Sequence, residues 1–142
     1  MSVVQEKRST AIDELTNIFA NRITTNVSVR DTHSRDESWH HPHKPDAVIF
    51  PQATEEVSEI VTVCARHKTP IIAYGTGTSL EGNVIPHHGG IVVDLERMGQ
   101  VLRVNVEDLD CTVQARVTRK QLNEHIRDQG IFFPIDPGAD AS

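Results

Sequence analysis

The sequence predicts an α+β fold in which a β-α-β unit is followed by a mixed sheet with flanking helices. Apolar strand patterns at 46–51 and 71–74 enclose a helical pattern, which is typical of a parallel crossover. Residues 101–106 and 111–117 then alternate apolar and polar side chains, as antiparallel strands do. A glycine-rich loop after the strand at 71–74 indicates a ligand site, because ligands of open α/β sheets bind at the carboxyl ends of strands.

The composition is that of an ordinary globular domain. A length of 142 residues suffices for one domain with a buried core. The formal net charge of −6, without a basic stripe, argues against a nucleic-acid partner. No apolar run approaches the ~20 residues of a membrane helix, and the amino terminus lacks the layout of a signal peptide, so we expect a cytoplasmic chain. Cys64 and Cys111 are isolated, which favours buried thiols over a disulfide or a zinc site.

Residues 1–44 are predicted to form an amino-terminal helix and a long polar loop. Apolar residues at helical spacing predict a helix from about residue 10 to about residue 20. Residues 22–45 are polar and aperiodic, so we expect a loop that Trp39 anchors to the core by its ring. Four histidines of this loop match no standard ligand spacing, and no metal is predicted; they are His33, His40, His41 and His43.

The next elements surround the glycine-rich loop. The helix of the crossover is expected to begin at a Thr54 cap and to end at about His67. Its inward face is predicted to consist of Val57, Ile60, Val61 and Cys64. After the loop, a turn at 87–90 leads into a buried strand at 91–95.

A hairpin, a helix and a short strand complete the chain. The hairpin turns at 107–110 and is expected to have one face in solvent. Thr118 and Gln121 have the spacing of a capping box, which predicts a helix that ends at Gly130 with its apolar residues inward. Residues 131–135 are predicted to form a strand that leads into a second turn of small residues.

The loop after the strand at 71–74 has the composition of a phosphate cradle. Three glycines are expected to allow positive φ, so that successive backbone N–H groups turn toward one anion; they are Gly75, Gly77 and Gly82. Three hydroxyls add donors, from Thr76, Thr78 and Ser79. The loop contains no Lys or Arg, so binding would rest on oriented dipoles.

Two familiar nucleotide motifs fail on spacing. A dinucleotide-binding glycine motif would need a small residue where the chain has Leu80. A P-loop would need a lysine where the chain has Asn83. The alternative that remains open at this point is a glycine-rich turn that joins two strands without binding anything.

Taken together, several motifs resemble the amino-terminal part of the FAD-linked oxidases of the vanillyl-alcohol-oxidase type. This family, which has a PCMH-type FAD-binding domain, includes D-lactate dehydrogenases and the glycolate oxidase flavoprotein subunit. The resemblance is greatest for the cytochrome-linked D-lactate dehydrogenases. The motifs lie at Ser34–Ser38, Pro45–Pro51, Tyr74–Gly82, Asp108–Val113 and Phe133–Ser142.

The resemblance implies that residues 45–142 form the first lobe of an FAD-binding domain. It implies that FAD is held by Tyr74, Gly75, Thr76, Gly77, Thr78, Ser79, Gly82, Asn83, Pro137, Gly138, Ala139 and Ser142. Relatives that bind flavin covalently through this loop use a histidine near its middle, where this chain has Thr78, so the resemblance implies a non-covalent FAD. Relatives continue into a second half of the FAD domain and a substrate domain. We therefore expect an amino-terminal fragment that has no catalytic residue and is inactive alone.

The implied activity is that of a flavin-dependent D-2-hydroxy-acid dehydrogenase, which oxidises D-lactate to pyruvate and passes electrons to a cytochrome or quinone. The full-length protein would be cytoplasmic or peripheral to a membrane. Two alternatives stay open. One is a glycolate oxidase subunit or another FAD-linked oxidase of the same fold, and the other is a non-catalytic module that binds a phosphate compound or a protein. A lobe without its partner lobe would expose an apolar face, so the isolated chain is expected to self-associate.

Overall fold

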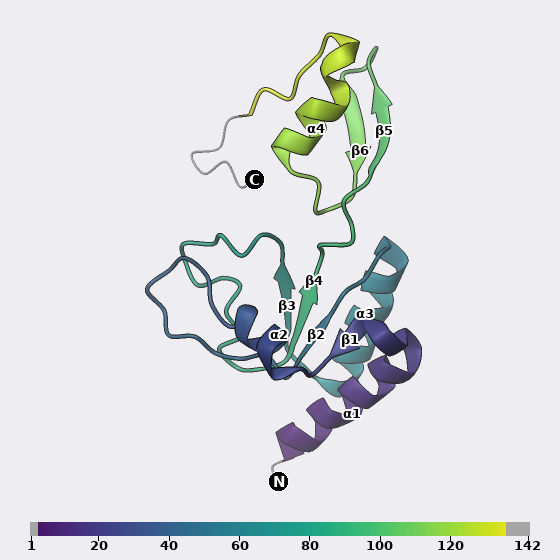
Figure 1. Cartoon of the computed structure of the whole chain (residues 1–142). Helices are drawn as coiled ribbons and strands as arrows, with labels where there is room; N and C mark the ends of the chain where they lie inside the picture. The colour runs from purple at the N-terminus through teal and green to yellow at the C-terminus, as the bar shows by residue number, and fades with distance from the viewer. Residues whose placement is uncertain (1–2, 136–142) are drawn as a thin grey trace.

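The computed structural model describes residues 3–135, with side chains from residue 8 onward. The larger sheet has the strand order β1-β2-β4-β3 (Figure 1). In that order the strands are Ile23–Thr24, Ala47–Ile49, Ile91–Asp94 and Ile71–Tyr74. Because β2, β4 and β3 are parallel and β1 is antiparallel to β2, the sheet is mixed and the predicted fold class is confirmed.

Two helices, α1 (Val3–Phe19) and α3 (Thr54–His67), cover one face of this sheet and pack on each other. The short 3-10 helix η1 (Ala20–Arg22) joins α1 to β1. Side chains of alternate strand residues point to this face and meet the helices in the main core. The core residues are Ala11, Leu15, Phe19, Ile23, Ala47, Ile49, Ile60, Val63, Cys64, Ile91 and Val93.

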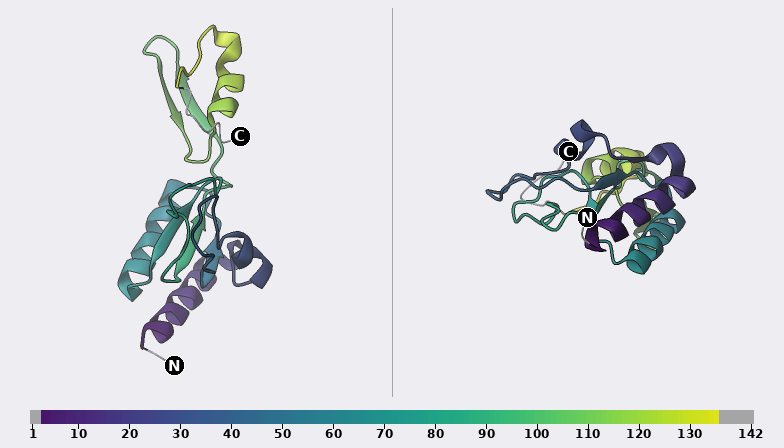
Figure 2. Two further views of the ribbon diagram at one scale, coloured as in Figure 1. Left: turned by 90° about the vertical axis from the view of Figure 1, so that its left-hand side faces the viewer. Right: turned by 90° about the horizontal axis from the view of Figure 1, so that it is seen from below.

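The opposite face of the sheet faces α2 (Val27–Thr32). Val48 and Val92 lie between residues that point toward α1 and α3, so they point the other way, and both are fully buried. Figure 2 shows α2 and α3 on opposite sides of the strands. The sheet is therefore covered on both faces, which explains why β2 and β4 are apolar without alternation.

A smaller unit follows the sheet. Strands β5 (Val101–Asn105) and β6 (Asp110–Val113) form an antiparallel hairpin. The helix α4 (Arg119–Ile126) and the 3-10 helix η2 (Arg127–Gln129) follow, and α4 packs on β5. Thr118 and Gln121 form the predicted capping box, and Gly130 ends the helical segment with φ +73°. Figure 1 shows this unit beyond the end of the larger sheet.

The amino-terminal region differs from the prediction in two ways. The helix begins at Val3 instead of about residue 10, because good helix formers already dominate from the start of the chain. Residues 22–45 are not a plain loop, because β1 pairs with β2 and the Asn26 side chain caps α2 by accepting hydrogen bonds from two backbone N–H groups.

The crossover also needed correction. Ala53, not Thr54, is the N-cap residue of α3, and its methyl group provides no cap hydrogen bond. The inward face contains Val63 in place of Val61, which is 46% exposed. Strands β2 and β3 are parallel but not adjacent, because β4 lies between them. The predicted parallel crossover is thus present, and β4, which comes later in the sequence, lies between its two strands.

In the smaller unit, two expectations were wrong. The hairpin does not have one buried face, since all four residues of β6 are exposed. Residues 131–135 are not a strand. The Asn123 side chain accepts from the N–H of Phe133 over 2.7 Å and donates to its carbonyl over 3.3 Å, so a side-chain amide takes the place of a partner strand.

Two single-residue expectations were also wrong. Trp39 does not anchor the polar segment, because it is 85% exposed and stacks on His40. Cys64 is a buried thiol, as predicted, and its burial raises its pKa to about 11. Cys111, which was also expected to be a buried thiol, is exposed on β6. None of the helices in the part of the chain that the structure describes is long and apolar enough to cross a membrane.

The corrected face of α3 predicts a difference between two valines. Val63→Ala is expected to lower the free energy of unfolding by about 2 kcal/mol, because it removes two buried methyl groups from a closed core. Val61→Ala is the matched control, and its effect is expected to stay within about 0.5 kcal/mol. Urea unfolding followed by circular dichroism measures both, and equal losses would contradict the assigned face.

Candidate functional site

The glycine-rich loop, residues 75–83, begins where β3 ends (Figure 1). Strands β3 and β4 are in parallel register with Tyr74 opposite Asp94, so both strands end beside the loop. The N–H of Leu95 donates to the carbonyl of Tyr74 over 3.0 Å and extends the pairing by one step. The loop therefore lies at the carboxyl edge of the sheet, as the sequence predicted.

The backbone of the loop depends on two of its three glycines. Gly77 has φ +75° and Gly82 has φ +74°, whereas Gly75 does not have a positive φ, contrary to the prediction. A Cβ at Gly77 would overlap the Tyr74 hydroxyl and lie 2.8 Å from its Cζ atom. A Cβ at Gly82 would lie 2.5 Å from Cδ2 of His40, while one at Gly75 would meet nothing within 4 Å. Side chains thus close over the loop at Gly77 and Gly82.

The loop offers an unusual set of donors. Within residues 3–135, no protein group accepts a hydrogen bond from the backbone N–H groups of residues 75–80. The hydroxyls of Thr76 and Thr78 contact each other over 2.9 Å, and both lie on the same loop. The Ser79 hydroxyl accepts from the N–H groups of Glu81 and Asn83, and it also interacts with the Asp36 carboxylate. Unpaired N–H groups and hydroxyls in one turn fit an anionic ligand such as a pyrophosphate.

A segment distant in sequence holds the loop in place, which sequence analysis did not find. The N–H of Glu37 donates to the carbonyl of Ser79 over 3.1 Å. The Asp36 carboxylate accepts from the N–H and hydroxyl of Ser38, and it faces Ser79 and Gly82. The motif around Asp36 was recognised, but only as part of a resemblance, since nothing local in the sequence tells which loop it contacts.

The electrostatic state of Asp36 follows from these contacts. Burial acts to raise the pKa of Asp36, but hydrogen bonds from Ser38 outweigh it and hold the pKa below the ordinary value of 3.8. The Ser79 side chain and the Gly82 backbone lower this pKa further. Asp36 is therefore an anion beside the loop, where it interacts with Ser79 and Gly82.

A buried pair lies under Tyr74. The Nε2 atom of His33 is 2.7 Å from Oδ2 of Asp94, and both side chains are 7% exposed. The other ring nitrogen, Nδ1, is 2.8 Å from the carbonyl oxygen of Val29 in α2. The His33 ring contacts the Tyr74 ring with centroids 4.5 Å apart. Burial, then the charges of Asp94 and Asp36, raise the pKa of Tyr74 and keep its hydroxyl neutral.

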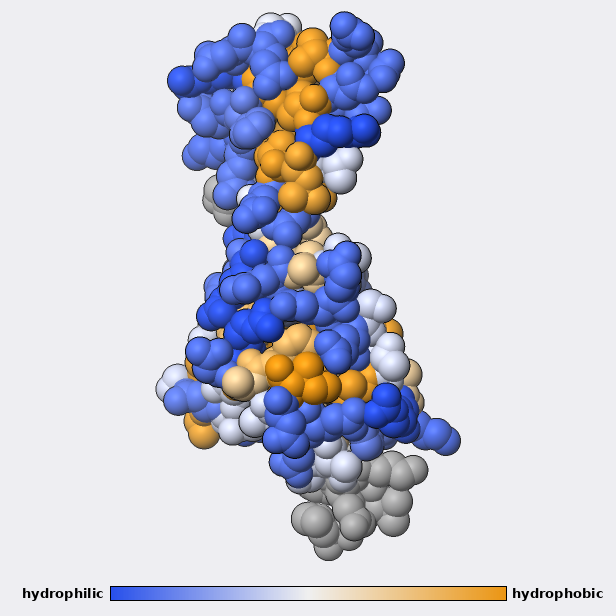
Figure 3. Space-filling view, turned by 90° about the vertical axis from the view of Figure 1, so that its right-hand side faces the viewer, coloured by the Kyte–Doolittle hydropathy of each residue, from blue (hydrophilic) through white to orange (hydrophobic). Residues whose placement is uncertain are grey.

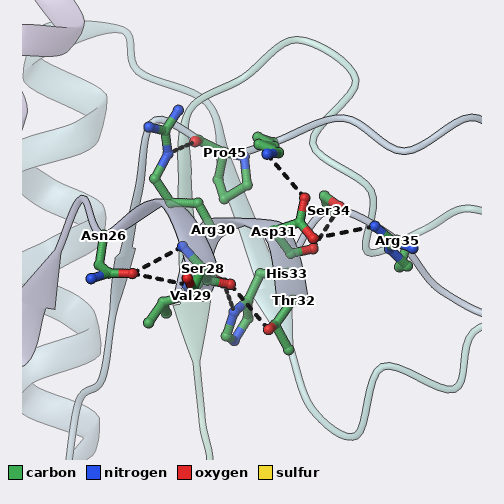
Figure 4. A network of polar contacts seen from close by, with 11 residues as sticks. Asn26, Ser28, Val29, Arg30, Asp31, Thr32, His33, Ser34, Arg35 and Pro45 are labelled. Carbon is green, nitrogen blue, oxygen red and sulfur yellow. Dashed lines mark hydrogen bonds and ion pairs between the residues drawn. The ribbon is translucent and has the colours of Figure 1, made fainter.

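The network around α2 explains how His33 reaches this position (Figure 4). Arg30 Nε donates to the carbonyl of Pro45 over 2.6 Å, which ties α2 to the start of β2. Asp31 forms ion pairs with Arg35 at 3.3 Å and with Lys44 at 3.0 Å. The Ser34 hydroxyl donates back to the carbonyl of Asp31 over 2.6 Å. The helix is short, but both of its ends are fixed.

The other histidines of this segment gather beside the loop. The ring centroids of His40 and His43 lie 5.6 and 5.2 Å from that of His87. The structure shows no group of three or more His, Cys, Asp or Glu side chains arranged to hold a metal ion among the residues that it describes. The His40 ring covers Gly82, so its role at the loop is steric.

The structure brings together only part of the predicted site. Residues 75–79, Gly82 and Asn83 lie on one loop, and Tyr74 is the last residue of the strand that precedes it. The other predicted cofactor residues, Pro137, Gly138, Ala139 and Ser142, lie outside the described residues.

A mixed α/β unit with unpaired donors at the carboxyl end of a parallel strand is typical of proteins that bind a phosphate-bearing cofactor. Residues 45–142 match the model of the FAD binding domain, and the chain belongs to this family. Its cofactor is FAD, and the predicted resemblance to FAD-linked oxidases is confirmed.

Curated relatives extend this result. A probable mitochondrial D-lactate dehydrogenase of Danio rerio is 48% identical over 120 residues, which are 84% of this chain and 24% of the relative. A mitochondrial D-lactate dehydrogenase [cytochrome] of Arabidopsis thaliana is 38% identical over 92% of this chain and 24% of its own length. A glycolate oxidase subunit of Bacillus subtilis is 37% identical over 78% of this chain and 23% of its own length. The chain thus spans about a quarter of the length of these relatives.

Solved structures share the fold. A 4-ethylphenol oxidase from Gulosibacter chungangensis, 27% identical, superposes with a TM-score of 0.81 over 96% of this chain and 28% of that protein. An alkyldihydroxyacetonephosphate synthase, 22% identical, gives a TM-score of 0.84 over 94% and 29%. A p-cresol methylhydroxylase, 21% identical, gives 0.77 over 89% and 25%. The predicted PCMH-type fold is confirmed.

Proposed function

We propose that this chain is the FAD-binding part of a flavin-dependent D-2-hydroxy-acid dehydrogenase that oxidises D-lactate to pyruvate. The observation that carries the proposal is the 48% identity to a probable D-lactate dehydrogenase over 84% of the chain, which includes the glycine-rich loop. When bound, FAD supplies a hydride acceptor for an alcohol carbon. This chain supplies residues that bind the cofactor.

The donor set of the loop supports a cofactor role for its residues. We propose that Tyr74, Gly75, Thr76, Gly77, Thr78 and Ser79 hold the pyrophosphate of FAD through backbone N–H groups and hydroxyls, with Gly82 and Asn83 completing the turn. The six unpaired N–H groups are the feature that a turn without a ligand would not need. Pro137, Gly138, Ala139 and Ser142 belong to the same proposal on the family resemblance alone.

We propose that FAD is bound without a covalent link. The loop contains no histidine or cysteine, and Thr78 occupies its exposed middle. Hydroxyls of threonine are weak nucleophiles at neutral pH unless a base activates them. The Thr78 hydroxyl contacts Thr76, and no base is its partner within the described residues.

The electron acceptor and the compartment stay proposals. The name of the Arabidopsis relative includes cytochrome, which supports a cytochrome as acceptor, with a quinone as the alternative. For the compartment, we propose a cytoplasmic or membrane-peripheral location, although the names of two relatives include mitochondrial. Fractionation of the native cell distinguishes these locations.

The second candidate function is that of a glycolate oxidase subunit, which the 37% identity to the Bacillus relative favours. The natural protein that carries this chain, loaded with FAD, is expected to reduce an artificial acceptor faster with D-lactate than with glycolate. A preference for glycolate would replace the first candidate by the second. FAD loading without activity on any 2-hydroxy acid would favour a non-catalytic module.

The loop predicts a contrast between two glycines. Gly77→Ala is expected to weaken FAD binding at least tenfold, because the left-handed φ strains alanine by about 1 kcal/mol or more and its Cβ overlaps Tyr74. Gly75→Ala is the matched control for folding, since its Cβ meets open space. Flavin fluorescence titration measures the dissociation constant of FAD for both variants.

Acid precipitation of the FAD-loaded wild type tests whether the flavin is covalently bound, and flavin that stays in the protein pellet would contradict a non-covalent site.

The smaller unit supports the proposal of self-association. A groove of about 530 Å³ lies between the hairpin, α4 and residues 130–135, and its lining includes Leu109, Leu122 and Phe132. Leu109 is 75% and Phe132 74% exposed, and Figure 3 shows apolar side chains gathered on this unit. Phe132→Ser is expected to shift the chain toward monomer in sedimentation velocity, because less apolar area is covered on association. A monomeric wild type at high concentration would refute the proposal.

A further inference from the structure

We propose that His33 is a positioning residue for the FAD loop: as an imidazolium held between α2 and Asp94, it fixes Tyr74 and through Tyr74 the turn at Gly77. This inference rests on the proposed FAD site and adds a residue to it that lies outside the loop. The affinity of the loop for FAD then depends on the protonation of a buried side chain that does not touch the ligand.

The charge of His33 follows from its two partners. The carbonyl oxygen of Val29, 2.8 Å from Nδ1, only accepts hydrogen bonds. An ionised Asp94 carboxylate, 2.7 Å from Nε2, also only accepts. Both ring nitrogens must carry hydrogen for both bonds to form, which makes His33 a cation. The second oxygen of Asp94 accepts from the N–H of Glu96 over 2.8 Å, so the carboxylate is itself fixed at the end of β4.

His33 is linked to the loop through the side chain of Tyr74. The His33 ring lies against the Tyr74 ring at 4.5 Å and a tilt of 54°. The Tyr74 side chain occupies the space beside Gly77 that a Cβ would need. The Phe50 ring lies edge-on to the His33 ring, with centroids 6.2 Å apart, and limits the places to which the His33 ring can move. A shift of His33 is therefore passed to Tyr74 and then to the left-handed part of the turn at Gly77.

Several charged groups face this pair from the elements packed around it. Asp94 and Glu96 come from the end of β4, Tyr74 from β3, and Arg97 lies over the Phe50 ring at 5.3 Å. Burial acts to lower the pKa of His33, but the hydrogen bonds to Asp94 and Val29 and the charges of Asp94 and Glu96 outweigh it, so the pKa is raised above 6.5.

The sign of the pH dependence follows. Because the folded pKa exceeds the unfolded one, the contribution of His33 is fully present below about pH 6.5 and is lost as the pH rises through the raised value. Neutral imidazole has one donor for two buried acceptors, so one bond must break above that value. Loss of one charge-assisted hydrogen bond corresponds to roughly a tenfold weakening where it is coupled to binding.

The experiment measures the dissociation constant of FAD between pH 5.5 and 9 for the wild type, His33→Gln and the control His43→Gln. His43 is exposed, and its ring faces His87 rather than Tyr74. The wild type and His43→Gln are expected to lose roughly tenfold in affinity toward high pH, whereas His33→Gln binds weakly with a flat profile. Imidazole ¹⁵N spectra of the apo wild type need no variant and are expected to show both nitrogens of His33 protonated at neutral pH.

The outcomes separate the two levels of inference. A folded wild type that binds no FAD at any pH contradicts the proposed function, whatever the state of His33. A wild type that binds FAD with the same pH profile as His33→Gln overturns the positioning role alone. A neutral His33 in the ¹⁵N spectra at pH 6 also overturns it. If His33→Gln does not fold, Asp94→Asn replaces it, and an unchanged pH profile in that variant contradicts the inference.

Discussion

The insertion of β4 between β2 and β3 is the constraint on which the rest of the structure depends. Its four residues are all buried, and they alternate between the two faces of the sheet. Ile91 and Val93 join the core under α1 and α3, while Val92 and Asp94 face α2. One short strand thus carries the apolar contacts of both layers, and its last residue is the buried carboxylate that receives His33.

The glycine-rich loop depends on parts of the chain that are remote in sequence. The N–H group of Glu37 binds the carbonyl of Ser79, and the Asp36 carboxylate interacts with Ser79 and Gly82. The His40 ring covers Gly82. Because these contacts hold the turn from outside, the N–H groups of residues 75–80 are left without a protein acceptor in the described part of the chain. A loop that used its own N–H groups to close would have none left for a pyrophosphate. The segment from α2 to β2 is therefore a support for the site, which gives a physical role to a long polar stretch.

The distribution of apolar surface differs sharply between the two units. The larger sheet is covered on both faces, and its core is closed. The hairpin and α4 bury Leu122 and Ile126 but leave β6 and the groove beside it exposed. The smaller unit is the part of the described chain whose stability gains most from a further surface against it, because uncovered apolar area is costly in water.

The sequence by itself determined the strands at β2, β3 and β4, the crossover helix, the capping box of α4 and the loop at the carboxyl end of β3, because local periodicity and spacing carry these features. Only the tertiary structure decided the strand order, the partners of His33 and Asp36, and the exposure of Trp39 and Cys111. These depend on which distant segments meet. A short helix such as α2 has too few residues for periodicity to reveal.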